Sequence, residues 1–375
     1  MIIGILKEDS PERRVALLPE SVSVLIKMMA EVQVESGAGT GAYVHDEAYQ
    51  SAGAGICSRN ELFENATLLI GINPPSVEEI ARMKPGTVLL SVLNPFFNKT
   101  VVTNLAKREV TSFSLDVIPR TSRAQSMDIL SSMATVAGYK AVLTAANLLP
   151  KFFPMFMTAA GTITPAKVLI LGAGVAGLQA LATSRKLGAV VEVFDVRAAV
   201  KEEVLGLGGK FVEVEGAVDD KAAGGYAVEQ SAEFKDRQAR AIHDHALKSD
   251  VVICTAQIPG KRAPVLLRNE TVRAMKPGSV VIDLAASTGG NCELTKNNEL
   301  VEINGIRILG NSAFPVDMPA DASRMFGKNV INFLKLMISS KGELNLNWED
   351  DLVKGTCVTH NGEVVNERIK SFVNS

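Results

Sequence analysis

Apolar residues in this chain fall into short runs of about five residues, separated by longer stretches in which apolar positions recur every three or four residues. The short runs are rich in β-branched residues and predict strands, whereas the longer stretches predict amphipathic helices. Because strands and helices alternate along both halves, we expect an α/β fold with parallel sheets covered by helices on both faces. The predicted strands cover residues 2–6, 32–35, 68–72, 88–93, 111–117, 168–171, 190–194, 210–214, 250–255, 280–284 and 306–310.

Two helical stretches, at 127–149 and 323–338, divide this pattern into two doubly wound, Rossmann-like lobes joined by long helices. The tail carries Asn361-Gly362 between alternating runs, which is a strong signal for a C-terminal hairpin with a two-residue turn. If the tail returns to the first lobe, that lobe is discontinuous in sequence. The expected domains are residues 1–132 plus 312–375, and residues 133–311.

One segment of the second lobe has the parts of a dinucleotide-binding unit in the expected order. An apolar strand at 167–171 leads into Gly172-Ala-Gly174-Val-Ala-Gly177, a helical stretch follows, and a second strand at 190–194 ends at Asp195. The GxGxxG pattern alone is weak evidence, but here it follows a strand, opens a helix and precedes an acid. The alternative is a buried βαβ unit whose glycines serve only packing.

Each glycine of this segment has a separate role in such a site. Gly172 permits the tight turn, Gly174 lets the backbone approach a pyrophosphate, and Gly177 lets helix and strand pack closely. The N–H groups at the helix N-terminus attract the anion. Asp195 would accept hydrogen bonds from the adenosine ribose and repel a 2′-phosphate, which predicts NAD(H) rather than NADP(H).

Composition narrows the class of protein. The 375 residues carry a net charge of −2 with both signs interspersed, which gives no electrostatic footprint for nucleic acid. We expect no membrane span, and the four cysteines are scattered without metal spacing, so a reduced cytosolic compartment and no metal are predicted.

Candidate proton-transfer groups are scarce. The four histidines are His45, His243, His245 and His360, and none has the setting of a general base. His243 and His245 are predicted to be exposed on different sides of a polar helix. An enzyme that oxidises an alcohol or amine must also move a proton, whereas hydride exchange between two nicotinamides needs no such group.

The densest polar cluster is the segment 119–132, which follows the predicted strand 111–117. Its two arginines, amide, acid and hydroxyls suit recognition of phosphate, ribose and carboxamide groups. The alternative is a plain helix N-terminus with Ser126 as cap and Asp128 in the first turn. That alternative leaves Arg120 and Gln125 unexplained, and both interpretations stay open on residue chemistry.

The segment 215–233 is rich in glycine, alanine and charge and contains one aromatic residue, Tyr226. It is expected to be a loop, either a lid over the site or an ordinary surface loop. Asp283 and the run 289–291 follow strands of the second lobe and are candidates to line the nicotinamide end.

The chain resembles domain I, the NAD(H)-binding component, of proton-translocating nicotinamide nucleotide transhydrogenase over nearly its full length. The segments that carry the resemblance are 7–8, 13–16, 34–39, 119–128, 172–177, 258–260 and 289–293. In that family an arginine, a glutamine and an aspartate at the spacing of Arg120, Gln125 and Asp128 form a loop that holds the nicotinamide against a partner's NADP(H).

The resemblance assigns roles to individual residues. Arg120 would contact the cofactor and pair with Asp128, Gln125 would touch the nicotinamide riboses and Ser131 the carboxamide, while Tyr226 falls at the family's mobile-loop tyrosine. The four residues expected to act in catalysis are Arg120, Gln125, Asp128 and Ser131. The residues expected to bind the cofactor are Arg120, Thr121, Ser122, Gln125, Gly172, Gly174, Val175, Ala176, Gly177, Asp195, Val196, Arg197, Gly225, Tyr226, Gln238 and Gln257.

Alanine dehydrogenase is a related family and the rival interpretation, an NAD-dependent amino-acid oxidoreductase. Its catalytic lysine and histidine correspond here to Ile72 and Asn94, and neither side chain transfers a proton at neutral pH. Gln257 departs from the transhydrogenase pattern, which has an apolar residue near the adenine, and this leaves the adenine contacts open.

The resemblance implies a Re/Si-specific, proton-translocating NAD(P)⁺ transhydrogenase in which this chain supplies NAD(H) and a separate β subunit supplies NADP(H). Hydride would pass directly between the two nicotinamides, and a membrane domain on partner subunits would move protons. We expect a homodimer held at the cytoplasmic or matrix-equivalent face of the inner membrane through its partners. A non-catalytic NAD(H)-sensing module is the remaining alternative.

Overall fold

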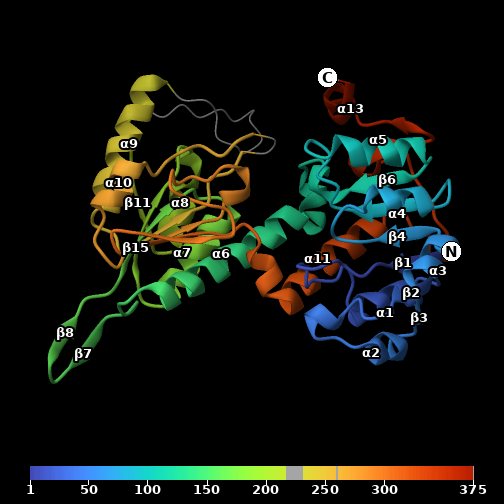
Figure 1. Cartoon of the computed structure of the whole chain (residues 1–375), viewed down its shortest axis with the longest axis horizontal. Helices are drawn as coiled ribbons and strands as arrows, with labels where there is room; N and C mark the ends of the chain where they lie inside the picture. Colours follow the sequence, from blue (N-terminus) through green and yellow to red (C-terminus); the bar gives the residue numbers. More distant parts are fainter. Residues whose placement is uncertain (217–230, 259–260, 375) are drawn as a thin grey trace. The chain divides into compact units, whose positions relative to one another are not determined.

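The computed structural model describes residues 1–216, 231–258 and 261–374 (Figure 1). The chain divides into two compact units, the first formed by Met1–Met133 with Pro315–Ser375 and the second by Ala134–Phe314. Unit 1 is therefore discontinuous in sequence. Both units are α/β layers built on a largely parallel sheet, which confirms the predicted fold class.

Unit 1 is built on an eight-stranded sheet in the order β17-β16-β6-β5-β4-β1-β2-β3. Strands β1 to β6 are parallel, and β16 runs antiparallel to both of its neighbours, β6 and β17. The strands are β1 (Ile2–Ile5), β2 (Glu31–Glu35), β3 (Gly55–Cys57), β4 (Leu68–Ile70), β5 (Val88–Ser91), β6 (Thr111–Ser114), β16 (Cys357–His360) and β17 (Glu363–Val364).

Helices cover both faces of this sheet. The strands carry apolar side chains on both faces, and each face needs a covering layer. On β4, Leu68 and Ile70 lie in one hydrophobic cluster and Leu69 in the other. The predicted strand 111–117 ends at Ser114, and its remainder is a 3₁₀ turn at Leu115–Val117. The helices are α1 (Pro19–Lys27), α2 (Asp46–Ser51), α3 (Arg59–Asn65), α4 (Val77–Arg82), α5 (Lys99–Lys107), α11 (Pro319–Leu334), α12 (Asp351–Thr356) and α13 (Glu367–Asn374).

The predicted C-terminal hairpin is confirmed. Asn361 and Gly362 have φ values of 48° and 80°, the left-handed conformation that a two-residue hairpin turn needs at both central positions. Through this turn β16 and β17 extend the parallel part of the sheet at β6.

Unit 2 is built on a seven-stranded sheet in the order β11-β10-β9-β12-β13-β15-β14. All pairs except β14–β15 are parallel, which gives the doubly wound order 3-2-1-4-5-6 with one antiparallel strand added. The strands are β9 (Lys167–Leu171), β10 (Val190–Phe194), β11 (Lys210–Phe211), β12 (Val251–Cys254), β13 (Val280–Asp283), β14 (Leu300–Ile303) and β15 (Ile306–Gly310).

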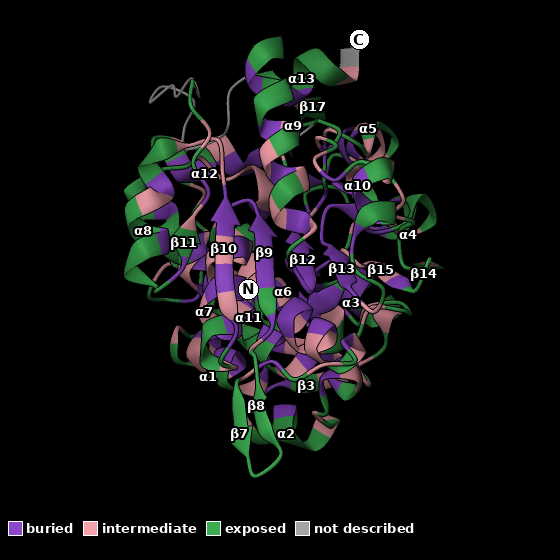
Figure 2. Ribbon diagram, turned by 90° about the vertical axis from the view of Figure 1, so that its left-hand side faces the viewer, coloured by how far each residue is buried: buried purple, intermediate pink, exposed green. Residues whose placement is uncertain are grey.

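The central strands of this sheet are buried on both faces, as the purple strands β9 and β12 in Figure 2 show. On β9, Val168 and Ile170 face one cluster while Leu169 and Leu171 face the other. The predicted strand 210–214 is shorter than expected and pairs only over Lys210–Phe211. The helices of the unit are α7 (Val175–Lys186), α8 (Lys201–Gly206), α9 (Ala232–Ala246) and α10 (Asn269–Ala274).

Helix α6 (Ile129–Leu148) runs from unit 1 into unit 2 along the chain. In the part of the chain that the structure describes, α6 is the one helix long and apolar enough to cross a membrane, judged by length and composition only. Its Ala141, Val142 and Ala145 are fully buried in the core of unit 2, which is typical of a core helix.

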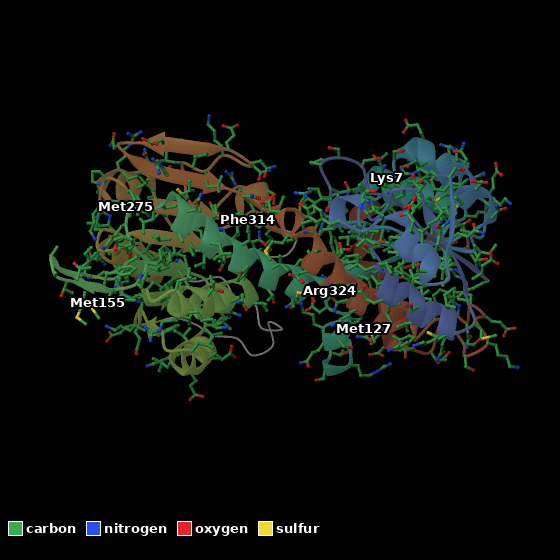
Figure 3. The ribbon with its side chains drawn as sticks, turned by 90° about the horizontal axis from the view of Figure 1, so that it is seen from below. Lys7, Met127, Met155, Met275, Phe314 and Arg324 are labelled. Atoms are coloured by element: carbon green, nitrogen blue, oxygen red, sulfur yellow. The ribbon has the colours of Figure 1, made fainter. Side chains whose placement is uncertain are left out.

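A two-stranded hairpin of β7 (Phe156–Thr158) and β8 (Gly161–Ile163) extends away from the sheet of unit 2 (Figure 1). Every residue of both strands is exposed, including Met157 at 76%. Met155, labelled in Figure 3, precedes the hairpin and is also exposed. The sequence analysis predicted no strands here, because the alternation of apolar and polar residues in this segment is too short.

Candidate functional site

The turn after β9 has the geometry that the glycine pattern predicts. Gly172 has φ +109°, which strongly favours glycine, and its N–H donates to the Phe194 carbonyl at 2.8 Å. A Cβ at Gly177 would lie 1.8 Å from the Gly172 oxygen, so that position packs the helix against the turn. A Cβ at Gly174 meets nothing within 4 Å, so that face of the turn is open.

Helix α7 begins on this open face. Gly174 is its N-cap, with extended backbone and no side-chain cap bond, so the first N–H groups of the helix depend on a ligand or water. Val175 is 42% exposed and Ala176 half-buried at this end. The free N–H groups and the positive end of the helix dipole form an anion-binding position.

Asp195 directly follows β10, and its carboxylate links that strand to the glycine turn by hydrogen bonds. Its Oδ2 accepts from the Ala173 N–H at 2.7 Å and from Arg197 Nη2 at 2.7 Å. Its Oδ1 accepts from the N–H and the Nε of Arg197, both at 2.9 Å. Val196, which lies between Asp195 and Arg197 in the sequence, packs against the core. The carboxylate is thus already bonded on both oxygens, a pairing that the sequence analysis missed.

The residues that follow β12 lie against the glycine turn. Thr255 Oγ1 lies 3.0 Å from the Gly172 carbonyl oxygen. Gln257, the residue that departs from the family pattern, donates from Nε2 to the Leu284 carbonyl at 3.0 Å. The sequence analysis did not predict a role for Thr255. The signal that could have found it is its position directly after β12, the strand that pairs with β9.

In unit 1 the polar segment after β6 forms a 3₁₀ helix, Ser122–Met127, followed directly by α6. Four side chains of this polar segment are exposed: those of Arg120, Thr121, Ser122 and Gln125.

Asp128 caps α6, accepting from the Ser131 N–H at 2.9 Å and from Ser131 Oγ at 2.6 Å. The proposed cap at Ser126 was therefore wrong, because the helix begins two residues later than that interpretation assumed.

Four side-chain contacts within unit 1 hold this loop in place. Arg123 forms ion pairs with Asp350, at 2.6 Å, and with Asp351. Asn329 and Asn332 of α11 donate to the Ser126 carbonyl at 2.8 and 3.1 Å. The anchors hold the segment around Ser126, while Arg120 and Gln125 stay on the exposed side.

The remaining predicted positions are spread over unit 2. Gln238 is buried on α9, and Gly225 and Tyr226 lie outside the described residues. Within the described ranges, no three His, Cys, Asp or Glu side chains gather as metal ligands.

The expectation that His243 and His245 are solvent-exposed was wrong. Both are half-buried: His243 Nδ1 lies 2.9 Å from Thr271 Oγ1, and His245 Nδ1 lies 2.6 Å from Glu192 Oε2. Each imidazole therefore has a polar partner on a neighbouring element of unit 2.

The fold and the turn together define a doubly wound α/β protein with a Rossmann-type glycine turn. Residues 4–137 match the family model "Alanine dehydrogenase/PNT, N-terminal domain", and residues 141–367 match "Alanine dehydrogenase/PNT, C-terminal domain". The chain therefore belongs to the alanine dehydrogenase/PNT family, and the predicted resemblance is confirmed.

Individual relatives agree with this assignment. The chain is 47% identical to the NAD(P) transhydrogenase alpha subunit (its first part) of Rhodospirillum rubrum, over 97% of this chain and 98% of that protein. It matches a crystal structure of transhydrogenase from Sinorhizobium meliloti with a TM-score of 0.89 and 42% identity, covering 97% of this chain and 100% of that one. Alanine dehydrogenase of Bacillus subtilis is more distant, at 29% identity over 98% of this chain and 94% of that protein.

Proposed function

We propose that this chain is the NAD(H)-binding component of a proton-translocating transhydrogenase, exchanging hydride with NADP(H) held by a partner subunit. The observation that carries the proposal is the open, uncapped turn at Gly174, with Asp195 bonded to its backbone. This turn lies in a chain that aligns over nearly its whole length with the transhydrogenase alpha-subunit chain of Rhodospirillum rubrum.

Unit 2 would hold the adenine half of NAD(H). The pyrophosphate would lie on the N–H groups of Gly174, Val175 and Ala176. The adenosine ribose would bond to Asp195, whose negative charge and short distance to the turn disfavour a 2′-phosphate. The other adenine-side positions in this proposal are Gly177, Val196, Arg197, Gly225, Tyr226, Gln238 and Gln257.

The nicotinamide half would be positioned by the loop after β6. Gln125 and Arg120 are exposed there, with Thr121 and Ser122 beside them, while Asp128 and Ser131 are fixed to each other at the start of α6. In this proposal Arg120 contacts the cofactor and pairs with Asp128, Gln125 contacts the ribose, and Ser131 contacts the carboxamide.

The chemistry asked of these residues is positioning rather than proton transfer. When bound, NAD(H) supplies the hydride donor or acceptor. Direct transfer between nicotinamides breaks no O–H or N–H bond, so the chain has only to hold one ring at near-attack distance from the other. The positions that alanine dehydrogenase uses for a base hold Ile72, which is buried, and Asn94.

We also propose that the chain is a homodimer joined through the β7–β8 hairpin. An isolated two-stranded ribbon is at best marginally stable in water, and this one exposes Phe156, Met157 and Ile163. A second copy that covers this apolar surface would explain both facts. Membrane attachment would be peripheral, on the cytoplasmic or matrix-equivalent side, through the NADP(H)-binding β subunit and a membrane domain.

A mixing experiment tests the catalytic proposal. The chain alone is expected to bind NADH yet show almost no turnover, and addition of the NADP(H)-binding partner should start rapid reduction of an NAD analogue by NADPH. NAD reduction with alanine by the isolated chain would instead support the alanine-dehydrogenase function. An inert mixture in which NADH still binds would overturn the hydride-exchange claim.

A further inference from the structure

The Thr255 side chain lies directly over the glycine turn. Strands β12 and β9 are neighbours with Cys254 opposite Leu171, so the next residue, Thr255, faces the start of the turn. Its N–H donates to the Leu171 carbonyl at 2.9 Å, and its hydroxyl lies 3.0 Å from the Gly172 carbonyl oxygen. The carbonyl of the first glycine in the motif is thus the nearer of two acceptors for the hydroxyl, since the Leu171 carbonyl oxygen lies 3.2 Å from it.

The same hydroxyl occupies the space beside two of the motif glycines. A Cβ at Gly172 would lie 2.7 Å from Thr255 Oγ1, and a Cβ at Gly177 would lie 3.2 Å from it. Thr255 thus fills the space that these glycines leave on the protein side, while Gly174 stays open on the other side.

Asn291 fixes the backbone next to Thr255. Its Oδ1 accepts from the Ala256 N–H at 2.9 Å, and its Nδ2 donates to the Ala256 carbonyl and to the Pro264 carbonyl, both at 2.8 Å. The Asn291 side chain is fully buried. Because one amide bonds both the N–H and the C=O of Ala256, it fixes the orientation of the peptide groups that follow β12.

Asp283 in turn holds the loop that carries Asn291. Its Oδ2 accepts from the Cys292 N–H at 2.9 Å and from Thr295 Oγ1 at 2.8 Å. Its Oδ1 accepts from the Ala285 N–H at 2.9 Å. Hydrogen bonds and the short backbone segments between them therefore link the end of β13, through Asn291 and Ala256, to the turn at Gly172.

We infer that Thr255 and Asn291 are positioning residues for the pyrophosphate-binding turn: Asn291 sets the backbone at Ala256, and the Thr255 hydroxyl holds the Gly172 carbonyl away from the anion. The inference rests on the proposed function for the identity of the ligand. Its physical basis is that a carbonyl free to rotate toward the phosphates would place a negative dipole where the N–H groups of the turn must act.

The matched pair Thr255→Val and Thr255→Ser tests this directly, because valine keeps the shape without the hydroxyl and serine keeps the hydroxyl. Calorimetry should show NADH and ADP-ribose binding about tenfold weaker to Thr255→Val and within about twofold of the unchanged chain for Thr255→Ser. Adenosine, which lacks the pyrophosphate, should bind all three proteins equally. Equal NADH affinity of the two variants, or an equal loss for adenosine, would overturn the inference.

Hydrogen exchange of the unliganded proteins gives a readout that does not depend on NADH. The amides of Gly172 and Ala173 should exchange faster in Thr255→Val than in Thr255→Ser, because they flank the held carbonyl and donate to Phe194 and Asp195 at the end of β10. Unchanged exchange in Thr255→Val contradicts the positioning role. If the unchanged chain binds no NADH, the proposed function fails, while this exchange experiment still decides the role of Thr255.

A double-mutant comparison tests the role of Asn291. Asn291→Ala should weaken NADH binding, and adding Thr255→Val to it should weaken binding by much less than Thr255→Val does in the unchanged chain. Fully additive losses would show that Asn291 does not act through Thr255.

Discussion

Arg197 bonds both carboxylate oxygens of Asp195, from Nε at 2.9 Å and from Nη2 at 2.7 Å, at the end of β10. The Asp195 side chain is only 7% exposed, and it also accepts from the Ala173 N–H of the glycine turn. A ribose that binds there must share this carboxylate with Arg197. In the proposed site, cofactor choice would therefore depend on a pair of side chains rather than on one acid.

The first prediction concerns this pair. Asp195→Asn should weaken NADH binding by about 10- to 100-fold, since hydrogen bonds to a charged group are among the strongest in proteins. It should also narrow the preference for NADH over NADPH, because the negative charge that opposes a 2′-phosphate is gone. Calorimetry with both nucleotides measures this, and Glu302→Gln on β14 is the control. An unchanged preference would remove Asp195 from its proposed role.

A second prediction separates two glycines of the same motif. Gly174→Ala should fold with unchanged Tm and lose most NADH affinity, because its methyl group enters space that is open in the protein. Gly177→Ala should be destabilised by about 2 kcal/mol or more, because its Cβ would lie 1.8 Å from the Gly172 oxygen. Gly206→Ala, whose Cβ meets nothing within 4 Å, is the control for both. Thermal melts and NADH titrations that failed to separate the two variants would contradict the proposed site.

Gln125 provides the third prediction. Gln125→Asn should slow hydride transfer at least about tenfold while changing the NADH Kd by less than about twofold, because the shorter side chain misplaces the ring without removing the adenine-side contacts. Gln50→Asn, at an exposed position on α2, is the matched control. Stopped-flow kinetics with the partner subunit provide the rate. Equal losses in rate and affinity would assign Gln125 to binding alone.

The only tryptophan reports on the C-terminal hairpin. The ring centroids of Trp348 and His360 lie 4.4 Å apart, and burial lowers the pKa of His360 below its ordinary value of 6.5. Trp348 emission should therefore be quenched by the protonated imidazole with a midpoint below 6.5. Because the folded pKa is the lower one, neutral His360 contributes stability above about pH 6.5, and this contribution is lost as the pH falls toward the folded pKa. A titration step that persists in His360→Gln would assign the quenching to another group.

The hairpin supplies a prediction about assembly. Replacing Phe156 and Met157 together by glutamate should convert the proposed dimer to a monomer in sedimentation experiments, because charge is then placed on the surface that a second copy would cover. Leu207→Glu changes another exposed apolar side chain of unit 2 and should leave the dimer intact. A double variant that remains dimeric would place the interface elsewhere.

Local patterns predicted much of this fold. Five-residue apolar runs gave the positions of the central strands, and Asn361-Gly362 gave the C-terminal hairpin, because each of these signals is contained in neighbouring residues. Strand ends were less accurate: 111–117 changes to a 3₁₀ turn after Ser114, and 210–214 keeps only two paired residues at the sheet edge.

The site was predicted only where the motif is local. Gly172, Gly174 and Gly177 have the turn geometry that their spacing implies. The contacts of Thr255 with Gly172, and of Asn291 with Ala256, join positions far apart in the sequence, and only the sheet order brings them together. The alternative interpretation placed the cap of α6 at Ser126 instead of Asp128, because either residue satisfies the sequence rule for a helix N-terminus.

The most direct test of the central claim follows an isotope. NADPH carrying deuterium at the transferred C4 position is mixed in ordinary water with this chain, its NADP(H)-binding partner and an NAD analogue, and the reduced analogue is analysed by mass spectrometry. Direct exchange between nicotinamides predicts that the deuterium appears quantitatively in the analogue. Reduced analogue without the label, or no reduction while NADH still binds to this chain, would contradict the account.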